Sequence, residues 1–549
     1  MSAPLRELPA GYYLQNFETL LAFVGQQYPD LLTPDERQFL STFRSLSEDA
    51  RKLYVRLVLR KGPLFRADKL NYPEIADLPA AARELQTNGL LGDGQGASVE
   101  MLAELLIKGE LARLCAASAS QRREVLVGIL ADRFTAQTLR HQLPFEIYEP
   151  LCTDCVLIFR LLFFGNLRQD FSDFVLNDLG IMQYESYVID AETRFFDARE
   201  TVEQLILLQQ LNDQLQSEDI RADPDALTAL AEQLPAGLAR GVERRGARLV
   251  NGIARQLERL GCTQAAEDLY RRTARGDARE RLIRILATTV DGAPEALNLC
   301  EQIAIAPETE AELTFAVSFA RRLCRKYHFD LPPLLSSPGS ESPQTLLLKL
   351  EQVPGERVER CVADWFEQQQ CEAFYAENWL FTGIFGLAFW DIIFAPVPGV
   401  FFNPFQLGPT DLFSADFHQD RAALISERLT EISHADVLTE RVLKQYDRSM
   451  GLANHFVHWG IVSEALLSKA LQRIPVTHFQ AIFRRLLRDL RHNRSGFPDL
   501  VIFPAQGGYE LIEVKGPGDK LQQNQLRWFS HFQAHQIPAR VALVEWRES

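Results

Sequence analysis

Three charged residues near the end of the sequence have the types and spacing for metal-assisted chemistry on phosphates. Asp499 follows Pro498 at the start of a short apolar run, and Glu513 and Lys515 lie two positions apart in a second such run. Because side chains alternate between the two faces of a strand, Glu513 and Lys515 would share one face. A hairpin between the two runs would then bring Asp499 beside Glu513.

Two carboxylates and one ammonium group in this arrangement suit the hydrolysis of a phosphodiester. Carboxylate oxygens bind hard divalent cations such as Mg²⁺ or Mn²⁺. The metal lowers the pKa of a bound water and offsets the charge that builds up on the phosphate. A lysine can stabilise that charge or orient the water. The alternative is an ordinary surface hairpin with solvated charges, because these residue types are common.

The segments around these residues predict an α/β domain with a mixed sheet at the end of the chain. Two short apolar runs, 500–503 and 509–514, flank a pair of glycines, which is typical of a hairpin. We expect a helix over about 521–536 and a last strand over 539–546. This order of strand, turn, strand and helix favours the chemical interpretation over the surface hairpin.

The rest of the chain is predicted to be mostly helical. Short amphipathic helices are expected in the first 75 residues, and residues 225–350 are predicted to form helix after helix. One piece, Ala265–Tyr270, has the spacing of tetratricopeptide-type pairs, with irregular helical stacking as the alternative. The apolar segment over about 372–394 is predicted as one long buried helix. Its most apolar run, 379–394, is too short for a bilayer and contains Asp391, so no membrane contact is expected.

Composition sets weaker limits. The 549 residues carry a formal net charge of -15, which counts mildly against a nucleic-acid ligand. Phosphates respond to local patches rather than to total charge, so the objection is weak. The eight cysteines are scattered, and the close pair Cys152 and Cys155 lacks the further ligands of a zinc site. Free thiols suit a reducing cytoplasm.

Two basic segments stand out against the acidic whole, 51–69 and 483–494. In the second, helical spacing puts Arg484, Arg488 and Arg491 on one face next to Asp499, which favours phosphate contact over a merely solvated face. The residues that we expect to contact DNA from the two segments are Arg60, Lys61, Arg66, Lys69, Arg484, Arg485, Arg488 and Arg491. A third cluster, within 271–284, is assigned to a solvated face, with the grip of a DNA end as the alternative.

The motifs around the charged residues resemble a known family. The run Gly496-Phe-Pro-Asp-Leu-Val-Ile-Phe503, the run Glu510-Leu-Ile-Glu-Val-Lys-Gly-Pro517, and Gln522 with Gln525 resemble the virus-type replication-repair nuclease (VRR-NUC) domain of the PD-(D/E)xK superfamily. The apolar segment that begins at Glu377 narrows the resemblance to the Fanconi-associated nucleases, which are structure-specific repair enzymes. Residues 54–75 and 165–198 resemble the DNA-binding module of that family.

This resemblance implies roles for individual residues. Asp499 and Glu513 would be metal ligands with the carbonyl of Val514, and these two carboxylates with Lys515 would be catalytic. Glu377 would take the place of the helix-borne acid of the family. We prefer it to Glu372 because it directly precedes the apolar helix. Gln525 matches a motif glutamine that supports the site, with a solvated helix residue as the alternative.

The resemblance also implies an organisation in modules. Residues 99–135 resemble the SAP motif, a two-helix DNA-binding element in which Arg122 and Arg123 would contact phosphates. The expected regions are a helical N-terminal region (1–75), a SAP-like module (76–225), a TPR-like helical region (226–355) and a VRR-NUC nuclease domain (356–549).

The function implied is that of a structure-specific endonuclease, a bacterial member of this family. It would use Mg²⁺ or Mn²⁺ to cut branched DNA near 5′ flaps during interstrand crosslink repair, with 5′ exonuclease activity as a further expectation. Its location would be the cytoplasm with the nucleoid, or the nucleus in a eukaryote; no protein partner is indicated. The competing hypothesis is a non-catalytic helical-repeat adaptor, against which the complete set of Asp499, Glu513 and Lys515 argues.

Overall fold

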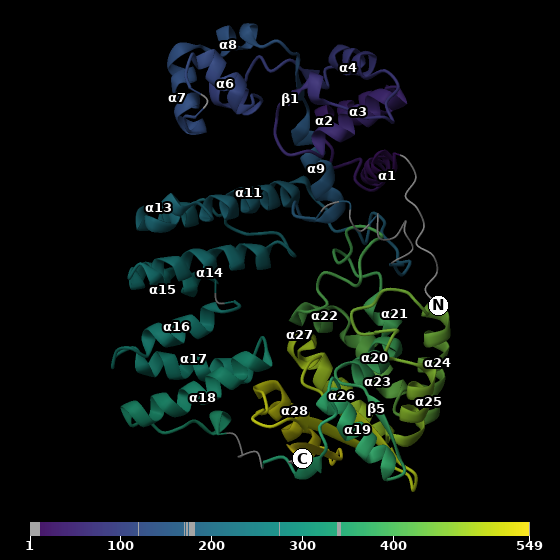
Figure 1. Ribbon diagram of the computed structural model, residues 1–549. Helices are drawn as coiled ribbons and strands as arrows, with labels where there is room; N and C mark the ends of the chain where they lie inside the picture. Colours follow the sequence, from purple (N-terminus) through teal and green to yellow (C-terminus); the bar gives the residue numbers. More distant parts are fainter. Residues whose placement is uncertain are drawn as a thin grey trace. The chain divides into compact units, whose positions relative to one another are not determined.

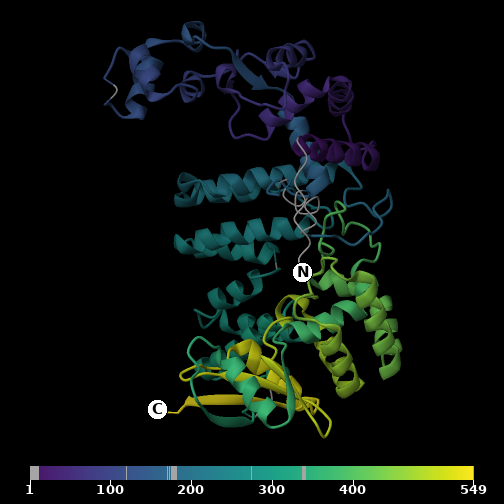
Figure 2. The same ribbon diagram turned by 45° about the vertical axis from the view of Figure 1, so that its right-hand side comes forward.

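The computed structural model describes residues 11–118, 120–169, 171, 174, 182–273, 275–336 and 342–547. The chain divides into two compact units, which are described separately (Figures 1 and 2). The first unit comprises the residues up to 181 together with 196–202, and the second comprises 182–195 and the chain from 203 onward.

The first unit begins with three amphipathic helices, as expected. They are α1 (Tyr12–Gln27), α2 (Pro34–Ser45) and α3 (Glu48–Val58). Helix α2 begins where the sequence supplies a capping box. The Thr33 hydroxyl accepts a hydrogen bond from the backbone N–H of Glu36, and the Glu36 carboxylate accepts one from the N–H of Thr33. In the core of this helical part, Phe43 packs edge-on against Phe17 and in a tilted arrangement against Tyr54.

A small sheet and further helices follow in the first unit. The strands are β1 (Phe65–Arg66), β2 (Leu91–Gly92) and β3 (Ile147–Pro150), in the order β1-β3-β2. The helices are α4 (Leu78–Thr87), α5 (Val99–Glu104), α6 (Lys108–Cys115), α7 (Arg123–Arg133), α8 (Ala136–Gln142) and α9 (Thr153–Phe164). Helices α5 to α8 enclose a core of their own that includes Leu102, Leu111 and Leu126. The helices expected from Val99 onward are therefore confirmed.

The second unit contains a series of helices, the first of which begins within the 196–202 stretch of the first unit. From the second of these helices onward, each packs on the next (Figure 1). They are α11 (Arg199–Leu215), α12 (Glu218–Ala222), α13 (Pro224–Glu232), α14 (Glu243–Arg259), α15 (Thr263–Thr273), α16 (Ala278–Leu286), α17 (Ala293–Ile305) and α18 (Glu310–Tyr327). Helix α14 shows why they stack: Leu249, Ile253 and Leu257 recur at helical spacing and are buried on one face. The expected run of helices is confirmed.

The chain then forms a mixed five-stranded sheet. Its strands are β4 (Thr345–Leu350), β5 (Cys371–Tyr375), β6 (Leu500–Pro504), β7 (Glu510–Lys515) and β8 (Ala539–Trp546), in the order β4-β8-β7-β6-β5. Strand β8 is parallel to both of its neighbours, whereas β7, β6 and β5 are antiparallel in succession. The expected hairpin and last strand are confirmed, and Gly507 and Gly508 have positive φ in its turn.

Helices cover both faces of this sheet (Figure 2). They are α19 (Val358–Gln368) on one face and, toward the other, α20 (Trp379–Ala388), α21 (Trp390–Ile393), α22 (Ala415–Asp420), α23 (Ala422–Glu431), α24 (Ala435–Ser449), α25 (Glu464–Arg473), α26 (Val476–Arg488), α27 (Leu490–Asn493) and α28 (Gln523–Ala534). Ile512 and Val514 pack against α19, whereas Leu511 joins the larger core with α20, α26 and α28. The side chains of β7 therefore alternate as expected.

Two expectations for the segments before the hairpin are wrong. The long helix expected over 372–394 is the strand β5 followed by two shorter helices, because residues 371–375 pair with β6. Glu372 consequently lies on a strand, where its carboxylate pairs with Lys469. Residues 345–350, which we placed in the helical region, form the edge strand β4 of the sheet.

The remaining general expectations concern membranes and thiols. No described helix combines the length and the apolar character needed to cross a membrane. The apolar run from Trp379 onward is buried in the core of the second unit instead. Within the described ranges the cysteines are free, including Cys152 and Cys155.

Candidate active site

Asp499 lies where strand β6 begins, directly opposite Glu513. The register pairs Leu500 with Ile512, so one further step places Asp499 across from Glu513. The carboxylate of Asp499 takes the place of a strand partner: its Oδ2 accepts a hydrogen bond of 2.8 Å from the backbone N–H of Val514. The hairpin therefore brings the two carboxylates together.

The backbone carbonyl of Val514 points toward the same end of β6 as the Asp499 carboxylate. The N–H and C=O groups of one residue in a strand point to the same side. Because the N–H of Val514 points to Asp499, its carbonyl points to the β6 side as well, beyond the last paired residue of β6. A main-chain oxygen thus joins the Asp499 carboxylate at this end of the sheet.

Glu513 is the most buried charged group of the site, with 1% of its surface exposed. Its Oε1 accepts hydrogen bonds from Nε2 of Gln525 at 2.5 Å and forms an ion pair with Nζ of Lys515 at 2.8 Å. Among the described residues, the buried Oε2 has no hydrogen-bond partner. A buried oxygen in this state requires a proton or a cation, so Glu513 is suited to hold a metal ion.

Glu377 joins the site from the segment between β5 and α20. Its backbone N–H and that of Ala376 both donate to the carbonyl of Asp499 at 2.9 Å. Its φ of 32° lies in the left-handed region, which non-glycine residues seldom adopt. The two hydrogen bonds hold this unusual backbone in place and keep Glu377 next to Asp499. It lies just before α20 rather than within it.

Three further residues at the site were not singled out from the sequence. The Tyr375 hydroxyl donates to Oε2 of Glu377 at 2.5 Å, and the Asn378 amide donates to Oε1 at 3.0 Å. The negative charge of Glu359, on α19, contributes to raising the pKa of Asp499. Tyr375 and Asn378 flank Glu377 and could have been considered for that reason, but nothing in the sequence links Glu359 to the hairpin.

Burial and mutual repulsion disfavour the charged forms of both central carboxylates. Burial raises the pKa of Glu513 to about 7, and the charge of Asp499 adds to the rise, while Lys515 opposes it. Burial likewise raises the pKa of Asp499 to about 6, against the opposing hydrogen bond from Val514. Two buried carboxylates whose pKa values are raised in this way are suited to bind a cation, because the cation compensates their negative charge.

The donor set fits a hard divalent cation. Asp499 and Glu513 offer carboxylate oxygens and Val514 offers a carbonyl, which are the oxygen ligands that Mg²⁺ accepts while it keeps several waters. No three His, Cys, Asp or Glu side chains of the described ranges are gathered so that they could hold a metal by themselves. Glu377 would therefore reach the ion through water, or after release from Tyr375.

Acidification should stabilise the metal-free protein relative to a Glu513→Gln variant. The pKa of this carboxyl rises from 4.5 to about 7 on folding. Its stabilising contribution is thus present below pH 4.5 and is lost as the pH rises through about 7. In EDTA, we expect the thermal midpoint of the variant to gain on that of the wild type between pH 5 and pH 8. An equal pH dependence of the two midpoints would contradict the raised pKa.

The basic residues expected to contact DNA from the first unit differ in their surroundings. Arg60, Lys61 and Lys69 are exposed, and Arg60 donates to the Tyr72 hydroxyl at 3.0 Å. Arg66 is 9% exposed and pairs with acidic side chains of its own unit, Asp68 and Glu110. The first three therefore offer free surface charge, and the Arg66 guanidinium has partners within the chain.

The two SAP-like arginines also differ. Arg122, which precedes α7, is exposed, whereas Arg123 donates to the carbonyls of Leu106 and Ala103. Arg123 thus satisfies the C-terminal end of α5. Phosphate contacts by either residue stay predictions.

The basic segment before Asp499 is not one continuous helix. Helix α26 ends at Arg488, and α27 begins a new turn at Leu490. Arg484 and Arg488 are exposed on α26, and Arg491 is exposed on α27, so the single helix face expected for these three is interrupted. Arg485 is 8% exposed and pairs with Glu310.

The third basic cluster is engaged within the protein. Arg281 pairs with Glu258 and Arg279 pairs with the buried Glu312. The other pairs are Arg271 with Glu267 and Glu295, Arg275 with Glu243, and Arg284 with Glu280. Arg284 pairs within its own helix, and the others pair across helices of the stack, which favours a role within the protein over the grip of a DNA end.

Comparisons with known proteins place this site in context. Two family models match the chain: the one described as FAN1, HTH domain, over residues 11–92, and the one described as VRR-NUC domain, over residues 430–546. The second match contains the hairpin with Asp499, Glu513 and Lys515. It begins after Glu377, so that the segment between β5 and α20 lies outside it.

Relatives extend the similarity to nearly the whole chain. The Fanconi-associated nuclease 1 homolog of Pseudomonas aeruginosa is 38% identical over 97% of this chain and 96% of its own length. The homolog of Arabidopsis thaliana is 30% identical over 94% of this chain and 65% of its own length. A crystal structure of paFAN1 bound to 2-nucleotide 5′-flap DNA with a gap superposes with a TM-score of 0.82 and 36% identity, over 99% of this chain and 100% of that chain.

Proposed function

This chain belongs to the Fanconi-associated nuclease 1 family, and we propose that it is a structure-specific endonuclease that cuts DNA near 5′ flaps. The observation that carries the proposal is the convergence of Asp499, Glu513 and Lys515 at one end of β6 and β7. The complete set argues against the non-catalytic adaptor that the sequence left open. The mostly helical fold with a mixed C-terminal sheet is that of the family.

We assign a separate role in phosphodiester hydrolysis to each residue of the site. A Mg²⁺ or Mn²⁺ ion, when bound, supplies an activated water and offsets phosphate charge. Asp499, Glu513 and the Val514 carbonyl would hold it. Gln525 fixes the orientation of Glu513 through the hydrogen bond to Oε1. Lys515 places a positive charge beside the carboxylates, where it can stabilise a phosphate oxygen as charge develops there.

The relative seen with 5′-flap DNA supports that substrate class, with 5′ exonuclease activity as a lesser component. We propose interstrand crosslink repair as the process, and the nucleoid of a bacterial cell as the place where the enzyme meets its substrate. The candidate DNA contacts from exposed side chains are Arg60, Lys61, Lys69, Arg122, Arg484, Arg488 and Arg491.

Cleavage should depend entirely on a divalent cation. We expect labelled 5′-flap DNA to be cut in Mg²⁺ or Mn²⁺ and to stay intact in EDTA, because the carboxylates need the ion to activate water. Gel analysis of the products against a double-stranded control without a flap checks both the metal and the substrate. Undiminished cleavage in EDTA, or equal cleavage of the control, would contradict the proposal.

Reversal of charge on the exposed face of α26 should weaken DNA binding. In the double variant Arg484→Glu, Arg488→Glu, fewer phosphates are neutralised, so the slope of log affinity against log salt should fall by about 2 units. The same change of charge at the exposed Arg255 and Arg259 on α14 is the control for net charge. A slope that is unchanged, or changed equally in the control, would remove α26 from the DNA path.

A further inference from the structure

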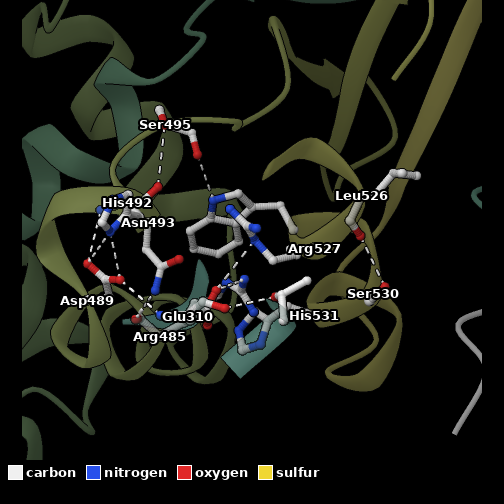
Figure 3. A network of polar contacts seen from close by, with 12 residues as sticks. Glu310, Arg485, Asp489, His492, Asn493, Ser495, Leu526, Arg527, Ser530 and His531 are labelled. Carbon is white, nitrogen blue, oxygen red and sulfur yellow. Dashed lines mark hydrogen bonds and ion pairs between the residues drawn. The ribbon is translucent and has the colours of Figure 1, made fainter. Parts of the chain in front are cut away.

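An ion-pair network joins the helical stack to the segment that leads into Asp499 (Figure 3). Its centre is Glu310, the first residue of α18. The Glu310 carboxylate accepts a hydrogen bond from Nη2 of Arg485 at 2.7 Å, and its backbone N–H donates to Oδ2 of Asp489 at 3.1 Å. Nε of Arg527, on α28, lies 3.8 Å from the same carboxylate. One residue of α18 thus contacts the end of α26, the start of α27 and α28.

Arg485 has little access to water that could replace Glu310, because only 8% of its surface is exposed. Its guanidinium is buried and lies over the ring of Trp528, with Cζ 4.7 Å from the ring centroid. Its carbonyl accepts a hydrogen bond of 2.9 Å from Asn493. A buried charge that loses its partner is strongly unfavourable, so removal of Glu310 should displace Arg485 and the groups that it contacts.

Two short paths lead from this network to the catalytic carboxylates. The indole N–H of Trp528 donates to the carbonyl of Ser495 at 3.1 Å, and its ring lies 4.0 Å from that of Phe497, two residues before Asp499. Trp528 is also one turn after Gln525 on α28, and Gln525 holds Glu513. The position of the Trp528 ring therefore affects both sides of the site.

We propose that Glu310 is a positioning residue for DNA cleavage, which acts from the helical stack through Arg485 and Trp528 to hold the segment before Asp499 and the helix that carries Gln525. This inference rests on the proposed nuclease function. It also changes the role of Arg485: this buried arginine positions the site, whereas the exposed Arg484 and Arg488 are the ones open to phosphate.

The same helix provides a matched control. Glu312 lies two residues after Glu310, is more deeply buried, and pairs with Arg279 at 2.6 Å. Its partners, Arg279 and the N–H of Glu308, belong to the helical stack and not to the segment before Asp499. Loss of either carboxylate should destabilise the fold, but only loss of Glu310 should disturb the site.

The test compares Glu310→Ala, Glu310→Gln and Glu312→Ala in the full chain. We expect Glu310→Ala to lower the single-turnover rate on 5′-flap DNA by about 10²-fold, since a misplaced catalytic group can cost that much. DNA affinity in Ca²⁺ should stay within about twofold of wild type, because the exposed cations remain. Glu310→Gln keeps an oxygen acceptor for Arg485 and should recover part of the rate. Glu312→Ala should cleave at the wild-type rate.

A further variant, Arg485→Lys, and a measurement of Mn²⁺ affinity test the role of Glu310 independently of its effect on folding. Arg485→Lys keeps the charge but not the planar group over Trp528, and it should lower the rate as Glu310→Ala does. Titration calorimetry with Mn²⁺ alone should show weaker binding in both variants than in Glu312→Ala. Equal rates and Mn²⁺ affinities for the Glu310 and Glu312 variants would overturn the inference. Wild-type cleavage in the same assay tests the nuclease function independently.

Discussion

Replacement of Glu513 by alanine is expected to abolish most cleavage of 5′-flap DNA while the chain stays folded. The carboxylate is buried, and one of its oxygens has no hydrogen-bond partner within the described ranges. Its removal therefore deprives the ion of a ligand, while the backbone pairing of β7 with its neighbours is kept. Asp499→Ala should have the same result. Lys515→Ala leaves the ion in place but removes a charge aimed at the phosphate, which typically costs about 10²–10³ in rate.

Single-turnover cleavage with saturating enzyme separates the chemical step from binding, and affinity is measured in Ca²⁺. Because these residues act on one step, Glu513→Ala with Lys515→Ala should be scarcely slower than the poorer single variant. Glu510→Ala is the matched control: it lies on the same strand, three residues away, and its carboxylate pairs with Arg540. Near wild-type cleavage by Glu513→Ala, or a loss in Glu510→Ala of similar size, would refute this assignment.

The replacement Asp411→Ala should destabilise the second unit by about 3–5 kcal/mol, the typical cost of leaving a buried charge without its partner. Arg421 is 1% exposed, and its Nη1 pairs with Asp411 Oδ2 at 2.7 Å. Its Nε donates to the carbonyl of Ile392, at the end of α21. The pair thus connects the loop before α22 to the apolar helices.

Calorimetry or chemical denaturation of the full chain measures this change. The control is Asp364→Ala on α19, where the partner Arg360 is half exposed and the cost should stay below about 1 kcal/mol. Similar shifts for the two variants would show that burial of the Asp411–Arg421 pair does not carry the stability assigned to it.

The hairpin could be predicted because the residues that determine it are close together in the sequence. Alternating apolar residues, a glycine pair and the Asp499, Glu513 and Lys515 spacing together specify two strands and a site at their end, and the structure agrees. Strand β5 was mistaken for the start of a helix because no glycine or proline separates it from α20 and because its pairing partner, β6, lies 125 residues further along the chain. Long-range pairing overrides local pattern here.

The surroundings of Arg484 and Arg485 also depend on residues that are distant in the sequence, so they could not be predicted from local pattern. Arg484 and Arg485 are adjacent in sequence and equally basic, and nothing local distinguishes a surface cation from a buried one. The partner that decides the matter, Glu310, comes from the helical stack, 175 residues away. Gln525 could be identified from its motif, but its hydrogen bond to Glu513 requires the position of α28, which only the fold provides.

The edge strand β4 has a practical consequence for any attempt to isolate the catalytic part of the chain. A fragment that begins at residue 356, the boundary expected from the sequence, would lack β4 and leave β8 at the border of the sheet. The backbone N–H and C=O groups of β8 that now pair with 345–350 would be free, beside the half-exposed Leu543. Such an edge is a template for another copy. We expect that fragment to aggregate, and one that begins before Thr345 to remain monodisperse.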